Sequence, residues 1–163
     1  MSLPESDMSD TRTGPSGQPA NAWFTCPRST LKPCVIEPYF YDIDGQKVLM
    51  TSIVFPLMVD GKVIASLSVD INLNSLQAIS QSASKRLYAG QTNVSILSPV
   101  GLLAGYSPDA SKLSQRLDSV DTTNGAELIR LLANSTQTQS LHSNRELKVL
   151  APFTPIPGGK AWG

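Results

Sequence analysis

The chain has 163 residues, of which 40% are hydrophobic and 16% are charged, and its 13 Lys and Arg balance its 13 Asp and Glu. This length suits one globular domain or two small ones. Because the formal net charge is zero, no strong field favours nucleic acid or an anionic membrane as a partner. No apolar stretch reaches the roughly 20 residues of a membrane-spanning helix, and no basic segment followed by an apolar run opens the chain. Any membrane anchors of the parent protein are therefore expected outside this chain.

The N-terminal part reads as irregular. Residues 1–20 are rich in Pro, Ser, Gly and Asp without an apolar period, which predicts a disordered segment, a long loop or an added segment foreign to the domain. Residues 22–35 contain further prolines, and we expect a loop there as well.

Cys26 and Cys34 are the only cysteines, and each has a proline beside it. Together with the single His142 they cannot complete a four-ligand zinc site, so no metal is expected. Two cysteines eight apart suit a loop closed by a disulfide, which would stabilise the fold by about 2.5 kcal/mol and favour an oxidising compartment. Two buried free thiols are the alternative.

The central part predicts an antiparallel meander of three strands. Residues 36–43, 48–59 and 62–73 are rich in aromatic and β-branched residues, and Asp-Gly pairs at 44–45 and 60–61 separate them. Asp-Gly between apolar runs is a strong hairpin signal. Side chains alternate between the two faces of a strand. In the third strand the apolar face is therefore expected to form the core: Val63, Ala65, Leu67, Val69, Ile71 and Leu73. Its polar face carries Ser66, Ser68, Asp70 and Asn72.

The remaining chain predicts a second α+β unit. Asn74 suits a helix N-cap with Gln77 as its capping-box partner, and Gly90 would end that helix. The further elements expected are a hairpin over 94–98 and 102–106, helices over 107–117 and 126–132, and two edge strands over 140–163, the second of which starts at Gly158-Gly159.

Three consecutive segments carry a resemblance to a known family. They are EPYFYDIDG at 37–45, VLMTSIVFPL at 48–57 and DGKVIASLSVDINL at 60–73. In order and spacing they resemble the core signature of the Cache family, and more closely they are similar to the double-Cache sensor regions of methyl-accepting chemotaxis receptors. The segment VSILSPVGLLAGYS at 94–107 resembles the opening hairpin of a membrane-proximal Cache module.

This resemblance implies an α+β fold of PAS-like antiparallel sheets with flanking helices, in which the N-terminal helix of the first module is missing. The implied organisation is a C-terminal part of a membrane-distal module over 21–76, a connecting helix over 77–91 and a truncated membrane-proximal module over 92–163. It also implies a periplasmic sensor of an inner-membrane chemoreceptor that forms a homodimer at full length. No catalytic activity and no cofactor are expected.

The candidate ligand-binding residues follow from the same resemblance. Asp70 matches an Asp that accepts hydrogen bonds from a ligand ammonium group, and Ser68 shares its face of the strand. Trp23, Phe24, Tyr39 and Tyr41 are the candidate aromatic contacts, because aromatic faces attract cations. The Arg that clamps a carboxylate in amino-acid sensors is Asn21 here. We therefore expect an amine or another polar metabolite as the ligand, and weak or no binding of ordinary α-amino acids.

Three other readings remain open at this stage. The same sensor could serve a histidine kinase or a diguanylate cyclase, because the output domain lies outside this chain. The pocket could also be collapsed, leaving a spacer without a ligand. A hydrolase with Asp42, Asp44 or Asp70 as the acid or base would need two carboxylates around one bond. However, Asp42 and Asp44 lie at a turn that favours Asp for its backbone conformation alone.

Overall fold

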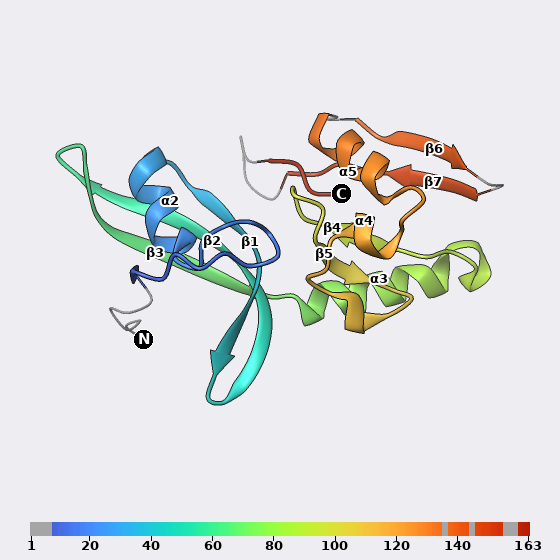
Figure 1. Cartoon of the computed structure of the whole chain (residues 1–163), viewed down its shortest axis with the longest axis horizontal. Coiled ribbons are helices and arrows are strands. Elements are labelled where there is room, and N and C mark those ends of the chain that lie inside the picture. The colour runs from blue at the N-terminus through green and yellow to red at the C-terminus, as the bar shows by residue number, and fades with distance from the viewer. Residues whose placement is uncertain (1–7, 135–136, 144–145, 155–159) are drawn as a thin grey trace. The chain divides into compact units, whose positions relative to one another are not determined.

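The computed structural model describes residues 8–134, 137–143, 146–154 and 160–163. It divides the chain into two compact units, Met1–Asn72 and Leu73–Gly163 (Figure 1). Each unit combines helices with antiparallel strands, as the α+β class requires. Among the described residues, no helix combines the length and apolar character that crossing a bilayer demands.

The first unit is built on the predicted meander. Strands β1 (Cys34–Ile43), β2 (Gln46–Val59) and β3 (Lys62–Asn72) form one antiparallel sheet in the order β1-β2-β3. At the β2–β3 turn both Asp60 (φ 48°) and Gly61 (φ 74°) are left-handed, and the β1–β2 turn at Asp44-Gly45 repeats this. Two left-handed central residues make a hairpin turn whose twist matches its strands. The sequence-based prediction of the meander is therefore confirmed.

Helix α2 (Ala22–Thr30) corrects the expectation of a loop over 22–35. Pro27 lies inside the helix, where its missing N–H costs one backbone hydrogen bond. The helix persists because Pro27 is fully buried and tertiary packing outweighs local propensity. It ends at Leu31, which is left-handed (φ 56°) and donates its N–H to the Pro27 carbonyl.

The core of this unit lies on the face of the sheet that α2 covers. Ala22, Cys34, Ile36 and Val54 form the buried cluster. Val54 lies opposite Ser68 in the register and is 0% exposed, so the polar face of β3 is the one turned towards α2.

The expectation that the apolar face of β3 forms the core is wrong. Leu67 is 67% exposed and Val69 is 53% exposed. Their neighbours on β2, Phe55 and Leu57, are exposed as well. From Ala65 to Ile71 the alternation holds, but the extra residue Ile64 puts Val63 on the other face of the sheet. Helix α2 covers the face that carries Ser68 and Asp70, which leaves the predicted apolar face exposed. Only Leu73, after the strand ends, is buried as expected.

Residues 8–20 form an irregular loop that is tied to the first unit, whereas residues 1–7 lie outside the described residues. The loop closes through a bridge between Thr13 and Pro19. Gln18 accepts a hydrogen bond from the backbone N–H of Glu37 at 3.0 Å, which fixes the loop to β1.

The second unit contains the remaining elements. These are α3 (Asn74–Arg86), η1 (Leu87–Gly90), β4 (Ser95–Leu97), β5 (Leu103–Tyr106), η2 (Ala110–Lys112), α4 (Leu117–Val120), α5 (Gly125–Asn134), β6 (Gln139–Ser143) and β7 (Glu146–Leu150). Its core is a cluster of leucines from five of them: Leu97, Leu103, Leu117, Leu132 and Leu150.

The hairpin over 94–106 and the helix over 126–132 are confirmed by β4, β5 and α5. The helix expected over 107–117 is wrong, since only the short η2 forms inside it. The segment instead folds back along β5, where the backbone of Leu103 bonds to Ser114 and Gln115. Near the end of the chain, Phe153 bridges to Trp162. The predicted strand start at Gly158-Gly159 lies outside the described residues.

The capping box expected at Asn74 is also wrong, because the N-cap of α3 is Leu73 and no side chain caps it. The Gln77 amide is used elsewhere: it donates to the carbonyl of Tyr106 at 2.9 Å and accepts from its N–H at 2.7 Å. This pair of bonds fixes α3 to β5. Gly105 allows the close approach, since a Cβ there would lie 2.3 Å from Ser80 Oγ.

Candidate ligand-binding site

A group of hydrogen-bonded side chains surrounds Asp70 near the end of β3. Ser52 on β2 lies directly opposite Asp70 in the register. Its hydroxyl donates to Asp70 Oδ1 at 2.6 Å, and the hydroxyl of Ser68 donates to the same oxygen at 2.7 Å. Ser52 is buried, whereas Ser68 and Asp70 are exposed. The carboxylate therefore has one oxygen held by hydroxyls within the sheet and is open to solvent.

Tyr39 extends this group onto β1. Its hydroxyl lies 2.7 Å from Ser52 Oγ. Burial raises the pKa of Tyr39; the Ser52 hydrogen bond opposes this rise, and the negative charge of Asp70 adds to it. Because an upward shift favours the protonated form, the phenol keeps its proton at neutral pH. Tyr39, Ser52, Ser68 and Asp70 are called the Asp70 network below.

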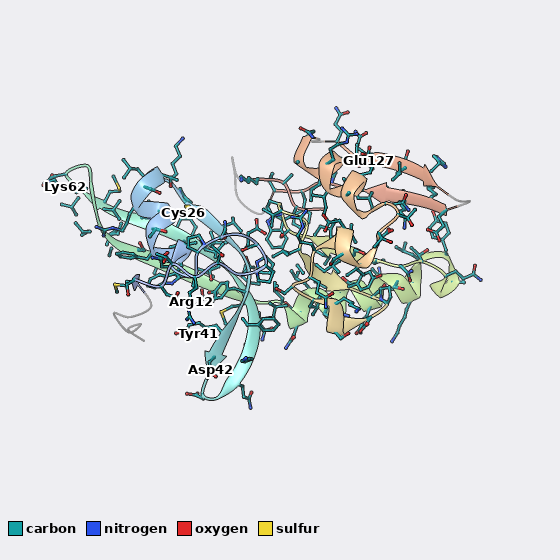
Figure 2. The ribbon with its side chains drawn as sticks, viewed as in Figure 1. Arg12, Cys26, Tyr41, Asp42, Lys62 and Glu127 are labelled. Carbon is teal, nitrogen blue, oxygen red and sulfur yellow. A yellow bond between two sulfur atoms is a disulfide. The ribbon has the colours of Figure 1, made fainter. Side chains whose placement is uncertain are left out.

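The predicted aromatic contacts divide into two groups. Trp23 and Tyr39 both pack against the buried cluster of the first unit. Phe24 instead packs against Trp23, with ring centroids 5.8 Å apart, and holds the guanidinium of Arg28 at 4.8 Å from its centroid. The phenyl face is thus already used by a cation of the chain itself. Figure 2 shows Tyr41 on the part of β1 that leads to the β1–β2 turn, apart from Cys26 on α2.

Ser52 is the network member that the sequence reasoning missed. The turn at Asp60-Gly61 predicts that residues whose numbers add to 121 face each other, which would place Val69 opposite Ser52. The observed register changes between Leu57 and Met58, so Ser52 faces Asp70 instead. Because β-bulges depend on local twist, alternation alone does not reveal them.

Asn21 stands where the resemblance places a carboxylate-binding Arg, and it serves a structural role. The side chain is buried, and its amide donates to the carbonyl of Met8 at 2.8 Å. An amide committed to the backbone offers no bidentate cation to a ligand carboxylate.

Cys26 and Cys34 are joined in the structure, with their sulfur atoms 2.07 Å apart and their Cα atoms 6.3 Å apart. The bond links the middle of α2 to the first residue of β1. It therefore fixes the helix that carries Trp23 to the strand that carries Tyr39.

Metal binding and acid–base chemistry each need particular side chains brought together. Within the described ranges, no three His, Cys, Asp or Glu side chains gather in a way that could hold a metal ion. Asp42, a candidate acid or base at the turn, accepts a hydrogen bond from the N–H of Gly45 at 2.8 Å. That bond explains Asp42 as a turn residue.

Comparisons with known proteins agree on the kind of domain. Residues 7–78 match the model of the first PDC sensor domain of methyl-accepting chemotaxis protein-like sequences. The methyl-accepting chemotaxis protein TlpQ of Pseudomonas aeruginosa is 48% identical over 162 residues, which are 99% of this chain and 22% of that protein. The chain thus spans less than a quarter of this relative.

Solved structures with the same fold include three sensor regions. The extracellular domain of a putative histidine kinase has a TM-score of 0.66 at 20% identity, and the match covers 86% of this chain and 51% of that one. The periplasmic sensory domain of the Campylobacter jejuni chemoreceptor Tlp1 has a TM-score of 0.63 at 12% identity, covering 80% and 47%. The ligand-binding domain of the P. aeruginosa amino acid chemoreceptor PctC in complex with GABA has a TM-score of 0.60 at 17% identity, covering 99% and 63%.

Proposed function

We propose that this chain, which matches a PDC (Cache) sensor model over residues 7–78 and is 48% identical to a methyl-accepting chemotaxis protein, is the extracytoplasmic ligand-sensing part of a bacterial chemoreceptor. Its ligand is a small protonated amine that lacks a carboxylate next to the amino group. The parent protein lies in the inner membrane, forms a homodimer and exposes this part to the periplasm. The observation that carries the ligand class is the exposed Asp70 carboxylate, which the Asp70 network holds in place.

The chemistry of the network favours a cation. Hydrogen bonds between an ammonium group and a carboxylate are about twice as strong as neutral ones. Tyr39 of the network and Trp23 on α2 both pack against the buried cluster of the first unit. A ring face near the ammonium group would add about 1–2 kcal/mol where water is excluded.

We expect a ligand without an α-carboxylate because Asn21 replaces the Arg that binds this group in amino-acid sensors. The neighbouring structures include chemoreceptor domains in complex with GABA, L-Arg and L-Ser, so carboxylate-bearing ligands are common among them. In this chain the Asn21 amide is committed to Met8 and supplies no cation to pair with a ligand carboxylate. This lack disfavours an α-amino acid.

Isothermal titration of the chain with three related probes tests this proposal. Butylammonium carries only the amine, norvaline is the same molecule with an α-carboxylate, and butyrate carries only the acid. We expect binding of butylammonium and at least tenfold weaker binding of norvaline and butyrate. Asp70→Asn should lower the butylammonium affinity tenfold to a hundredfold, as expected for a charge-assisted hydrogen bond.

Asp42→Asn is the matched control. It also removes one exposed carboxylate from the sheet, but its amide oxygen can still accept from Gly45. Equal effects of the two substitutions, or norvaline binding as tight as butylammonium binding, would refute the amine site. No binding of any probe would favour the spacer without a ligand.

The same sensor on a histidine kinase remains the second candidate, because an extracellular histidine kinase domain shares the fold. The chemoreceptor and the histidine kinase are separated by measuring whether the parent protein's output region has kinase activity or accepts methylation.

A further inference from the structure

The hydrogens of the Asp70 network have a defined direction. An aspartate carboxylate only accepts hydrogen bonds, whereas a serine hydroxyl has a single proton to donate. Ser52 Oγ lies 2.6 Å from Asp70 Oδ1, so its proton is used in that bond. The contact between Tyr39 and Ser52, at 2.7 Å, allows either oxygen to be the donor by geometry alone. Since the Ser52 proton is already committed, Tyr39 must be the donor.

The result is a relay that runs from the Tyr39 O–H to the Ser52 O–H and on to Asp70 Oδ1. The Ser68 proton ends on the same oxygen, at 2.7 Å. All three hydroxyl protons of the network are therefore consumed inside it. What remains for a ligand is the acceptor capacity of Asp70 Oδ2 and of the Tyr39 and Ser68 oxygens.

Ser52 is the residue on which this direction depends. It is 1% exposed, so it does not reach a ligand itself. It is the only member of the network that both accepts from one partner and donates to another. The upward shift in the pKa of Tyr39 keeps the phenol protonated, which the relay requires.

We infer that Ser52 is a positioning residue that turns the Tyr39 hydroxyl proton inwards, so that the Asp70 network offers only acceptors and selects ligands rich in N–H donors. This inference rests on the proposed amine-sensing function and deepens it. A primary ammonium group has three donors and no acceptor, and therefore fits such a site. A quaternary ammonium group has the same charge without donors, and a carboxylate has only acceptors.

The test compares two serine-to-alanine substitutions around the same carboxylate. Ser52→Ala removes the acceptor of the Tyr39 proton, which can then turn towards a ligand. Ser68→Ala removes the other hydroxyl from Asp70 Oδ1 but leaves the Tyr39 proton committed. Binding of butylammonium, tetramethylammonium and butyrate is measured by calorimetry for both variants and for Ser52→Thr, which restores a hydroxyl.

We expect Ser52→Ala to weaken butylammonium binding about tenfold and to leave tetramethylammonium binding within twofold of wild type. The ratio of the butylammonium affinity to the butyrate affinity should fall in this variant. Ser68→Ala should weaken butylammonium binding without lowering that affinity ratio, and Ser52→Thr should restore both the butylammonium affinity and the ratio. The inference would be overturned if Ser52→Ala bound butylammonium within twofold of wild type. It would also be overturned if Ser68→Ala lowered the ratio of butylammonium to butyrate affinity as much as Ser52→Ala does.

A readout without ligand separates this inference from the proposed function. The 13Cζ NMR resonance of Tyr39, assigned with Tyr39→Phe, should move in Ser52→Ala and stay in Ser68→Ala. An unmoved resonance in Ser52→Ala overturns the relay whatever the binding data show. A moved resonance in a protein that binds no amine supports the relay and refutes the proposed function.

Discussion

Removing the bond between Cys26 and Cys34 should destabilise the first unit strongly. The two residues are eight apart in sequence. In the chain-entropy model, closing a loop of this size in the unfolded chain contributes about 2.5 kcal/mol at 25 °C. For a cooperative unit of roughly 70 residues, each kcal/mol corresponds to about 4–8 °C in melting temperature. We therefore expect Cys26→Ala/Cys34→Ala to lower the melting temperature of this unit by about 10 °C or more.

Differential scanning calorimetry of the double variant measures this shift, and the wild-type protein with a reductant is the matched control. Both samples lack the cross-link, but only the variant has altered side chains. Similar shifts in the two samples would assign the effect to the cross-link rather than to lost packing of Cys34, which is buried. A double variant that melts within about 2 °C of the oxidised wild type would refute the reasoning.

Three further predictions follow from the two units. Val54→Ala should cost about 2 kcal/mol in chemical denaturation, because Val54 is fully buried, whereas Leu67→Ala should cost less than about 0.5 kcal/mol; equal costs would contradict the exposed face of β3. Gln77→Ala should destabilise the second unit by about 1–3 kcal/mol, since it leaves two backbone groups of β5 without their partner; an unchanged denaturation midpoint would contradict this. The Arg12 guanidinium beside Asp10 lowers the pKa of that carboxyl to about 2, so its stabilising interaction is present at neutral pH and is lost as the pH falls from 3.8 to about 2. NMR titration of Asp10 should show this low pKa and its return to the ordinary range in Arg12→Ala.

The part of the fold that the sequence predicts best is governed by local chemistry. The Asp-Gly pairs at 44–45 and 60–61 define both hairpins of the meander, because few residues other than Gly, Asn and Asp accept left-handed backbone angles there. Alternation along β3 likewise predicts that Asp70 and Ser68 share one face, and in the structure the Ser68 hydroxyl donates a hydrogen bond to Asp70 Oδ1.

The sequence-based predictions that are wrong concern features determined by contacts between residues distant in sequence. Helix α2 contains Pro27, which disfavours a helix locally, but the side chain is buried against the rest of the unit. The apolar side chains on one face of β3 predict that this face forms the core, but which face is covered depends on segments distant in sequence. Gln77 suits a capping box by its spacing, but its amide instead meets β5, about thirty residues further along the chain.

The candidate site was predicted in part for the same reason. The resemblance predicts Tyr39 and Asp70 as ligand contacts, and the structure connects them through Ser52. Recognising Ser52 requires the one-residue register change between β2 and β3. The aromatic ring of Phe24 makes it a candidate ligand contact, but Arg28, one helical turn away, already lies over this ring.

A crystal structure of the chain with bound butylammonium tests the central claim most directly. The account predicts the ligand nitrogen within about 3 Å of Asp70 Oδ2, with the two serine hydroxyls still donating to Oδ1. A nitrogen bound elsewhere on the chain, or a ligand that leaves Asp70 in contact with water alone, would contradict it.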